Sequence, residues 1–273
     1  MNPFSWQERT ELLLKTANVE KLRNSHVFIA GLGGVGAFAA EMLCRVGIGR
    51  LTIADGDCVT PTNINRQLIA LQSTQGRRKV EVMAERLYDI NPELNLTIHD
   101  TFLRDGITRQ LVNQPFDYVV DAIDTVSPKI FFIHHVVSSG LPLISSMGAG
   151  GKLDPSKVFV ADFANTYQCN LANQIRKKLR KLGVDSGFKA VFSTEPVCPE
   201  SLMFIENESN KKTSAGTISY LPAIFGCYCA SVVIRDLLFI PYELALRPTS
   251  KKNPKINKII QTKSPKDCLD EAH

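Results

Sequence analysis

The sequence predicts an α/β protein built on a doubly wound, mainly parallel sheet of Rossmann type, with helices on both faces and a C-terminal α/β extension. Two observations carry this prediction. Short apolar segments suited to buried strands alternate with helical segments over the first 146 residues, and a glycine-rich turn joins the first strand segment to the helix that follows it. Strands that alternate with helices in this way are typical of βαβ units, whose parallel strands are joined by crossovers.

The first βαβ unit is predicted over residues 25–57. Residues 26–30 are apolar and suit a buried strand, an apolar helix is expected over 35–46, and residues 51–54 are predicted as the second strand. Asp55 follows at the carboxyl end of that strand, where a ribose hydroxyl needs an acceptor. The turn before the helix contains glycines that let backbone N–H groups approach phosphate oxygens: Gly31, Gly33, Gly34 and Gly36. The unit therefore predicts a nucleotide site.

The later elements follow from periodicity and from helix-breaking residues. Over 76–90 apolar residues recur at helical spacing, and Asn91-Pro92 ends the segment. Ser127 and Pro128 favour the start of a helix that extends to Gly140. The remaining strands are predicted at 94–99, 116–122 and 141–146.

Charged and polar residues after these strands favour a triphosphate over a dinucleotide. The free tail of ATP carries about four negative charges, so its site needs cationic side chains and a metal ion. Arg66 and Lys79 can contact phosphates, and Asp124 can hold Mg²⁺. A nicotinamide-dependent oxidoreductase would leave these three residues without a task, and a pure binding module would not need them.

These motifs, in order and at natural spacing over residues 4–165, resemble the ThiF/MoeB/HesA family, the prokaryotic relatives of ubiquitin-activating enzymes. The resemblance implies that Asp57 and Arg66 act on the ATP, that Lys79 contacts its phosphates and that Asp124 binds the metal. It also implies a homodimer, in which Arg9 reaches into the partner's site. The motifs are the GxGGxG turn, D-x-D at Asp55 and Asp57, N-x-N-R-Q with Asn63, Arg66 and Gln67, Lys79, and D-x-x-D ending at Asp124.

The second half of the chain combines Gly148–Gly151, Asp154-Pro155, a basic helix and the stretch 192–195. This pattern resembles one branch of the family, the tRNA threonylcarbamoyladenosine dehydratases, and extends the likeness over residues 4–235. The branch uses ATP, in a ligase-like step, to activate the threonyl carboxylate of threonylcarbamoyladenosine beside the tRNA anticodon. The substrate's own carbamoyl group then closes a ring, which needs positioning rather than an enzyme thiol.

Two points about the reaction stay open. The main alternative is an adenylyltransferase that activates the C-terminal glycine of a small sulfur-carrier protein, and sulfur-transfer proteins are candidate partners of relatives. The ATP step is either adenylation or phosphorylation of the carboxylate, because both use the same cradle.

A basic cluster after the nucleotide half predicts contact with tRNA phosphates, which is independent of sequence and sensitive to salt. Leu179 and Leu182 are expected on the inner side of its helix. The alternative is a solvated helix face followed by a disordered tail, since residues 247–266 contain seven Lys or Arg and no acid. The cluster comprises Arg176, Lys177, Lys178, Arg180 and Lys181.

The cysteines and the composition indicate a cytoplasmic enzyme. The 273 residues contain seven cysteines at irregular spacing, carry a net charge of +5 and begin with a polar segment that lacks a secretory signal. The two C-x-x-C pairs of a structural zinc site are missing, so no zinc is expected. Cys169 and Cys198 are candidates for thioester chemistry, although cysteine is more commonly a small buried hydrophobe.

Three segments are predicted along the chain. Residues 1–165 form an ATP-binding domain with an N-terminal helical arm, 166–246 form a tRNA-facing extension on the same core, and 247–273 form a basic, flexible tail. The uncharged stretch Gly216–Ile234 is close to the lower length of a membrane span. Pro222 near its middle favours instead a buried C-terminal helix that begins close to that residue, so a membrane partner is not expected.

Overall fold

The computed structural model describes residues 5–197, 199–204 and 213–248. Cys198 and almost all of the basic tail therefore lie outside the described residues. A seven-stranded sheet has the strand order β3-β2-β1-β4-β5-β7-β6, in which only β6 runs antiparallel to its neighbour. Its strands are β1 His26–Ala30, β2 Arg50–Ala54, β3 Asn95–His99, β4 Tyr118–Asp121, β5 Leu143–Ser146, β6 Val158–Asp162 and β7 Lys189–Ser193.

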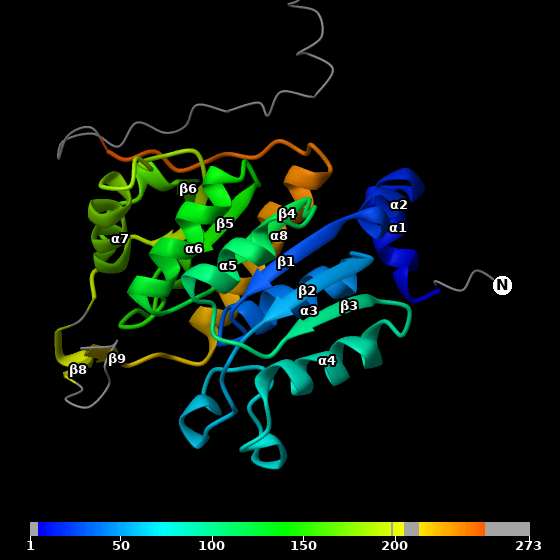
Figure 1. Ribbon diagram of the computed structural model, residues 1–273, viewed down its shortest axis with the longest axis horizontal. Helices are drawn as coiled ribbons and strands as arrows, with labels where there is room; N and C mark the ends of the chain where they lie inside the picture. Colours follow the sequence, from blue (N-terminus) through cyan, green and yellow to red (C-terminus); the bar gives the residue numbers. More distant parts are fainter. Residues whose placement is uncertain (1–4, 198, 205–212, 249–273) are drawn as a thin grey trace, which may run out of the picture.

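Helices cover both faces of this sheet (Figure 1), which confirms the doubly wound fold. One apolar core joins α3, α4 and α8 to the sheet, and a second joins α5, α6 and α7 to its other face. A small antiparallel pair, β8 Leu202–Phe204 and β9 Thr213–Ala215, lies outside the main sheet. The helices are α1 Glu8–Leu14, α2 Thr16–Asn24, α3 Gly36–Val46, α4 Lys79–Ile90, α5 Asp105–Val112, α6 Val126–Ser138, α7 Asn170–Arg180 and α8 Tyr220–Leu237.

The boundaries differ from the sequence prediction where turns intervene. The helix expected from residue 76 begins at Lys79, because Gly76 has a φ of +79° and Arg78 is extended with a ψ of 131°. The helix α6 begins at Val126, with Thr125 rather than Ser127 at its N-cap. The helix α5 was not predicted.

The strand order makes the carboxyl end of β1 a topological switch point. The two neighbours of β1 are β2 and β4, so the crossover from β1 leads to one side of the sheet and the later strands lie on the other. Open α/β sheets bind ligands at such a switch point, beyond the carboxyl ends of the strands. The glycine turn, Asp55 and the β4–α6 connection all lie at this end.

The helix α8 is a core element. Leu221, Phe225 and Cys229 are fully buried, and an added Cβ on Gly226 would lie 2.5 Å from the carbonyl oxygen of Val35 at the start of α3. By length and composition alone α8 could cross a membrane, a property that buried helices of globular proteins share. Pro222 lies in its first turn, where proline is tolerated, so the predicted start is close to the observed one.

The segment after residue 166 contributes to the same sheet. The strand β7 lies between β5 and β6, pairing parallel with the first and antiparallel with the second. The C-terminal extension therefore completes the core that the nucleotide-binding half begins.

Candidate functional site

The glycine turn brings three parts of the chain into close contact. Gly31 has a φ of +90°, and a side chain at Gly36 would collide with the carbonyl oxygen of Gly31. A Cβ on Gly34 would lie 2.9 Å from Pro222 of α8 and 3.3 Å from the carbonyl oxygen of Arg66. No side chain caps the start of α3. The N–H of Ala37 donates to the carbonyl oxygen of Gly33 at 3.3 Å, but the helix dipole still favours an anion at this end.

Asp55 is fixed at the carboxyl end of β2 by the backbone around it. Its Oδ2 accepts a hydrogen bond from the N–H of Leu32 at 2.6 Å, and its Oδ1 accepts one from the N–H of Asp57 at 2.8 Å. Burial raises the pKa of the Asp55 carboxyl, while Lys79 and the two N–H donors oppose that rise. Each oxygen keeps a further lone pair, so the group can still accept from a ribose hydroxyl.

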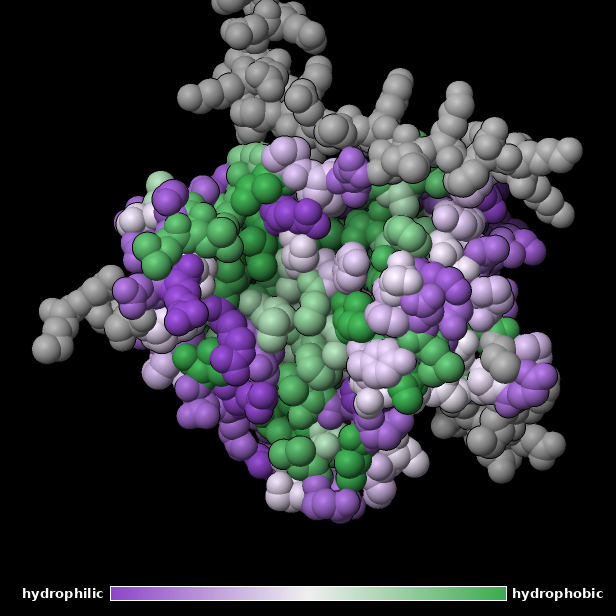
Figure 2. All heavy atoms as spheres, turned by 180° about the vertical axis from the view of Figure 1, so that it is seen from behind, coloured by the Kyte–Doolittle hydropathy of each residue, from purple (hydrophilic) through white to green (hydrophobic). Residues whose placement is uncertain are grey.

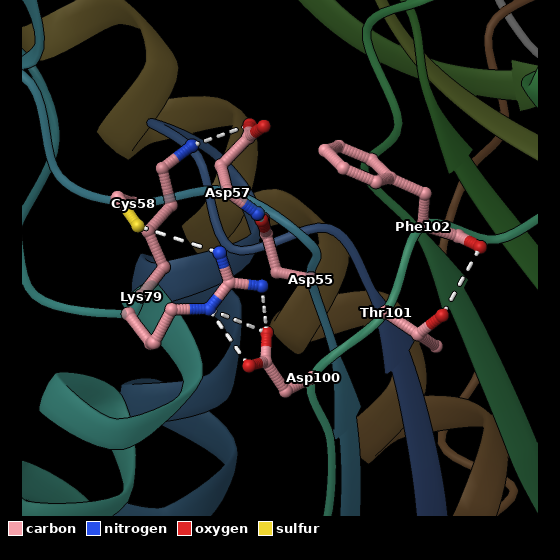
Figure 3. A network of polar contacts seen from close by, with 8 residues as sticks. Asp55, Asp57, Cys58, Lys79, Asp100, Thr101 and Phe102 are labelled. Atoms are coloured by element: carbon pink, nitrogen blue, oxygen red, sulfur yellow. Dashed lines mark hydrogen bonds and ion pairs between the residues drawn. The ribbon is translucent and has the colours of Figure 1, made fainter.

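Lys79 and Asp57 form an ion pair beside Asp55 (Figure 3). The Nζ of Lys79 lies 2.9 Å from the Oδ2 of Asp57. The side chain of Lys79 is 6% exposed and that of Asp57 is 53% exposed. The lysine is therefore held from inside the protein, while the carboxylate is open to solvent. Lys79 and Asp57 therefore lie together beside Asp55.

Arg78 was missed by the sequence reasoning. Its Nε donates to both carboxylate oxygens of Asp100 at 2.8 and 2.7 Å, and its Nη1 lies 3.3 Å from the Sγ of Cys58. These contacts tie the start of α4 to the ends of β2 and β3, near the exposed ring of Phe102 (Figure 3). The sequence has two adjacent arginines before Lys79, and nothing in it distinguishes Arg78, which binds Asp100, from an ordinary surface charge.

The N-x-N-R-Q loop lies beside the glycine turn. Arg66 donates from Nη1 to the carbonyl oxygen of Thr62 at 2.9 Å and to Oδ1 of Asn65 at 2.8 Å. Asn65 in turn donates to the carbonyl oxygen of Thr217 at 2.9 Å, which joins the loop to the segment before α8. The Oδ1 of Asn63 accepts from the N–H of Thr60 and shapes the turn.

Gln67 provides evidence that this loop fits a ligand. Its side chain is 8% exposed, and its Oε1 has no hydrogen-bond partner among the described residues. Its Nε2 would lie 3.8 Å from a Cβ on Gly33, so the amide faces the glycine turn. Buried polar atoms normally have partners, so an unpaired acceptor at this place fits a bound nucleotide.

The two aspartates of D-x-x-D have different surroundings. Asp124 is exposed in the loop between β4 and α6. Asp121 is fully buried, with Lys129 Nζ and Ser145 Oγ each 2.6 Å from its Oδ2. Among the described residues no three His, Cys, Asp or Glu side chains gather as a metal site. One carboxylate is still sufficient for Mg²⁺, which proteins commonly bind through one or two carboxylates together with substrate phosphates.

The structure does not bring Arg9 to the site of its own subunit. Arg9 is exposed on α1, and the nearby residue Gln7 donates to the carbonyl oxygen of Val46 at the end of α3. The glycine turn lies at the other end of α3, whose 11 residues span about 16 Å.

The basic helix differs from the prediction at two positions. Arg176 is 5% exposed and donates to the carbonyl oxygens of Thr166 at 2.8 Å and Phe163 at 3.2 Å. Burial also lowers the pKa of its guanidinium. Arg176 therefore braces α7 from inside and does not face tRNA, which corrects the prediction. Leu179 is buried as expected, but Leu182 is 40% exposed because α7 ends at Arg180.

The remaining members of the cluster match the expected surface. Lys177, Lys178, Arg180 and Lys181 are exposed at the end of α7. Positive side chains near a helix C-terminus also interact favourably with its dipole. These four residues form the α7 basic surface.

The described cysteines do not gather into a zinc site, and the Cys169 thiol is largely buried. Cys169 is 6% exposed at the N-cap of α7. On α8, Cys227 is exposed whereas burial raises the pKa of Cys229 to about 12. Two residues apart on a helix, these thiols face opposite directions and cannot converge on one ion.

Comparison with known proteins identifies the family. The model of the ThiF family matches residues 7–269. The chain belongs to the ThiF family. This confirms the resemblance based on the glycine turn and the motifs that follow it.

Several extensive matches are to one group of relatives. The chain is 38% identical over 237 residues to the tRNA threonylcarbamoyladenosine dehydratase of Bacillus subtilis, covering 84% of this chain and 93% of that protein. It is 40% identical over 258 residues to the Escherichia coli protein of the same name, covering 86% and 95%. The crystal structure of E. coli TcdA in complex with ATP superposes with a TM-score of 0.78 at 35% identity, over 86% of this chain and 96% of that one.

Proposed function

We propose that the protein is an ATP-dependent dehydratase that activates the threonyl carboxylate of threonylcarbamoyladenosine in tRNA and drives its cyclisation. The observation that carries the proposal is the likeness to the dehydratases across both halves of the chain. The molybdopterin-synthase adenylyltransferase of E. coli, by contrast, matches over only 46% of this chain. The likeness to the dehydratases thus covers more of the chain than the likeness to this adenylyltransferase, which favours tRNA over a sulfur-carrier protein.

The chemistry follows from the poor electrophilicity of a carboxylate. A carboxylate oxygen attacks the α-phosphorus of ATP, and pyrophosphate leaves. The carbamoyl group of the substrate then attacks the activated carbonyl carbon and gives up a proton to solvent, and AMP leaves with the former carboxylate oxygen. The substrate thereby loses the elements of one water. We favour adenylation over phosphorylation because E. coli TcdA has been solved with AMP as well as with ATP.

The site residues supply binding and charge. Asp55 orients the ribose, and the glycine turn with the N-terminus of α3 meets the phosphates. Arg66 and Lys79 stabilise charge as it develops on the α-phosphorus and on the leaving pyrophosphate. Asp124 would hold Mg²⁺, which supplies further neutralisation of the phosphates when bound.

We further propose that the active unit is a homodimer in which Arg9 serves the partner's site. The position of Arg9 far from its own glycine turn supports this arrangement. Apolar side chains also remain open on the surface: Leu12 and Leu13 of α1 are 68% and 80% exposed. Figure 2 shows a broad apolar area on the back of the molecule, the side on which α3 and α8 pack. An exposed apolar area of this kind is typical of a protein interface.

The α7 basic surface would contact tRNA phosphates. Its charges come from the half of the chain that follows the nucleotide motifs, so substrate and ATP can be held by different parts of the fold. A tRNA substrate and several unpaired cysteines also support a cytoplasmic location.

One experiment separates the two candidate activities. The protein is incubated with ATP and either total tRNA containing threonylcarbamoyladenosine or a sulfur-carrier protein with a Gly-Gly end. We expect AMP and pyrophosphate only with tRNA, and a modified nucleoside lighter by one water in mass spectrometry. ADP and phosphate would indicate phosphorylation. Nucleotide turnover with the carrier protein alone would refute the tRNA assignment.

A further inference from the structure

We propose that the buried ion pair between Asp121 and Lys129 is a latch that positions the loop carrying Asp124. The loop comprises residues 122–125, between β4 and α6, and is called the β4–α6 loop below. The inference rests on the proposed function, because Asp124 matters to the reaction only if this site binds Mg²⁺ and ATP. Lys129 and Asp121 themselves are positioning residues, since neither reaches the surface.

Both charges of the latch are engaged on the backbone of the loop. Asp121 and Lys129 have fully buried side chains, with Nζ and Oδ2 2.6 Å apart. Lys129 also donates to the carbonyl oxygen of Ile123 at 3.0 Å, and the N–H of Ile123 donates to Oδ1 of Asp121 at 3.1 Å. The latch therefore fixes the peptide groups on both sides of Ile123, immediately before Asp124.

The same loop packs on the phosphate-binding turn. The N–H of Ala122 donates to the carbonyl oxygen of Ala30 at 2.8 Å. A Cβ on Gly31 would lie 2.9 Å from the carbonyl oxygen of Ala122. The glycine turn and the β4–α6 loop thus share one contact surface, and a shift in the loop would move Asp124 relative to the phosphate cradle.

Stability alone does not account for a charged pair at this place. Taking both charges out of water is costly, and replacing a buried ion pair by apolar residues of similar volume is often neutral or stabilising. An apolar pair cannot reproduce the hydrogen bonds to Ile123, however. Ser145 of β5 adds a third constraint by donating to Oδ2 of Asp121 at 2.6 Å. The pair is thus suited to fixing one loop conformation.

The test replaces both charges together, as Asp121→Leu with Lys129→Met. The control makes the same pair of changes at Asp236 and Lys189, which form an ion pair at the start of β7, where the amino ends of the parallel strands lie. Three properties are measured: thermal stability, hydrogen exchange of residues 122–125 in the free protein, and calorimetric binding of ATP with Mg²⁺.

We expect the Asp121–Lys129 double variant to remain folded, with a melting temperature close to that of the wild type. Its loop amides should exchange about 10-fold faster or more, and ATP binding with Mg²⁺ should weaken by a similar factor. The control should leave loop exchange and ATP binding unchanged, whatever happens to its stability.

Unchanged exchange of residues 122–125 in the double variant would overturn the latch, whether or not ATP binds. Failure of the wild type to bind ATP would refute the proposed function instead. Hydrogen exchange of residues 122–125 would still test the latch in that case. If the double variant does not fold, Ser145→Ala removes one constraint on Asp121 and should raise loop exchange by a few-fold. Wild-type exchange in Ser145→Ala would then refute the latch.

Discussion

The Nζ of Lys79 lies 2.9 Å from the Oδ2 of Asp57, so the cation expected to meet phosphate is oriented by a carboxylate of the same site. A lysine carries three donors, and the pair leaves the others for a ligand. Because the stem of Lys79 is buried and Asp57 is half exposed, the ammonium can stay in place while phosphate oxygens approach. The ion pair would thus hold Lys79 in position for the proposed phosphate contact before the nucleotide binds.

The first prediction separates the two partners of this pair. Lys79→Ala should lower kcat/KM for ATP by about 10²-fold or more, because a charge that stabilises the reacting phosphate is removed. Asp57→Asn keeps a hydrogen-bond acceptor for Lys79, so it should lower kcat/KM for ATP by about 10-fold or less. Release of AMP and pyrophosphate with saturating tRNA provides the measurement. Equal reductions in the two variants would mean that Asp57 acts on the nucleotide directly.

The second prediction concerns shared sites. Arg9→Ala and Asp124→Ala should each be inactive. A mixture of the two variants should regain about a quarter of the activity if subunits exchange at random, because one site of the mixed dimer has its own Asp124 and an intact Arg9 from the neighbour. Turnover is measured after exchange has been demonstrated by mass spectrometry of differently tagged subunits. No recovery would place Arg9 outside the partner's site.

Local patterns predicted the fold well where a strand and its turn are close in sequence. The limits of β1 and the helix α3 follow directly from an apolar run, a glycine turn and an amphipathic segment. The helix α5 was missed, and the start of α4 was placed early because the turn at Gly76 gives no apolar signal. The position of β7 between β5 and β6 depends on pairing between strands 45 residues apart, from Ile144 to Lys189, and no local pattern encodes it.

The candidate site was predictable where a motif fixes both the residue and its position after a strand. Asp55, Arg66, Lys79 and Asp124 all lie at the predicted end of the sheet. The anchoring contacts were not predictable, because Lys129 is separated from Asp121 by a loop and its burial appears only in three dimensions. Arg176 illustrates the opposite error. A run of basic residues predicts an exposed surface, but Arg176 is buried.

A third prediction links stability to pH through His26. Burial lowers the pKa of His26 below its ordinary value of 6.5, and Arg50 adds to this effect while Asp117 opposes it. The unfolded chain therefore binds the proton more readily. The contribution of His26 to the free energy of unfolding should be complete above about pH 6.5 and should decline as the pH falls below that value. Chemical denaturation at a series of pH values from about 5 to about 8 gives the free energy of unfolding.

The His26 contribution can be isolated by substitution. His26→Gln should flatten the decline of unfolding free energy in acid, and the slope that remains is assigned in part to His99, whose pKa is also lowered by burial. An identical slope in wild type and variant would show that His26 keeps its ordinary pKa in the folded protein.

A fourth prediction concerns the α7 basic surface. Lys177→Gln with Lys178→Gln should raise the KM for tRNA and reduce the log–log salt slope by about 0.7 to 0.9 for each phosphate that the protein no longer neutralises. The binding of ATP alone should not change. Arg50→Gln with Arg109→Gln removes two exposed charges elsewhere and serves as the matched control. If both pairs of substitutions reduced the slope equally, tRNA would be attracted by overall charge and not by α7.

The last prediction tests whether the enzyme uses a thiol. Cys169→Ser should retain most of the dehydratase activity, because Cys169 is 6% exposed and the ring-closing nucleophile belongs to the substrate. The change should instead reduce stability slightly, since it places a hydroxyl where a thiol packs among apolar side chains. The rate of nucleoside dehydration and the melting temperature are measured together. A folded Cys169→Ser protein without activity would indicate a covalent intermediate on sulfur and would favour a protein substrate over tRNA.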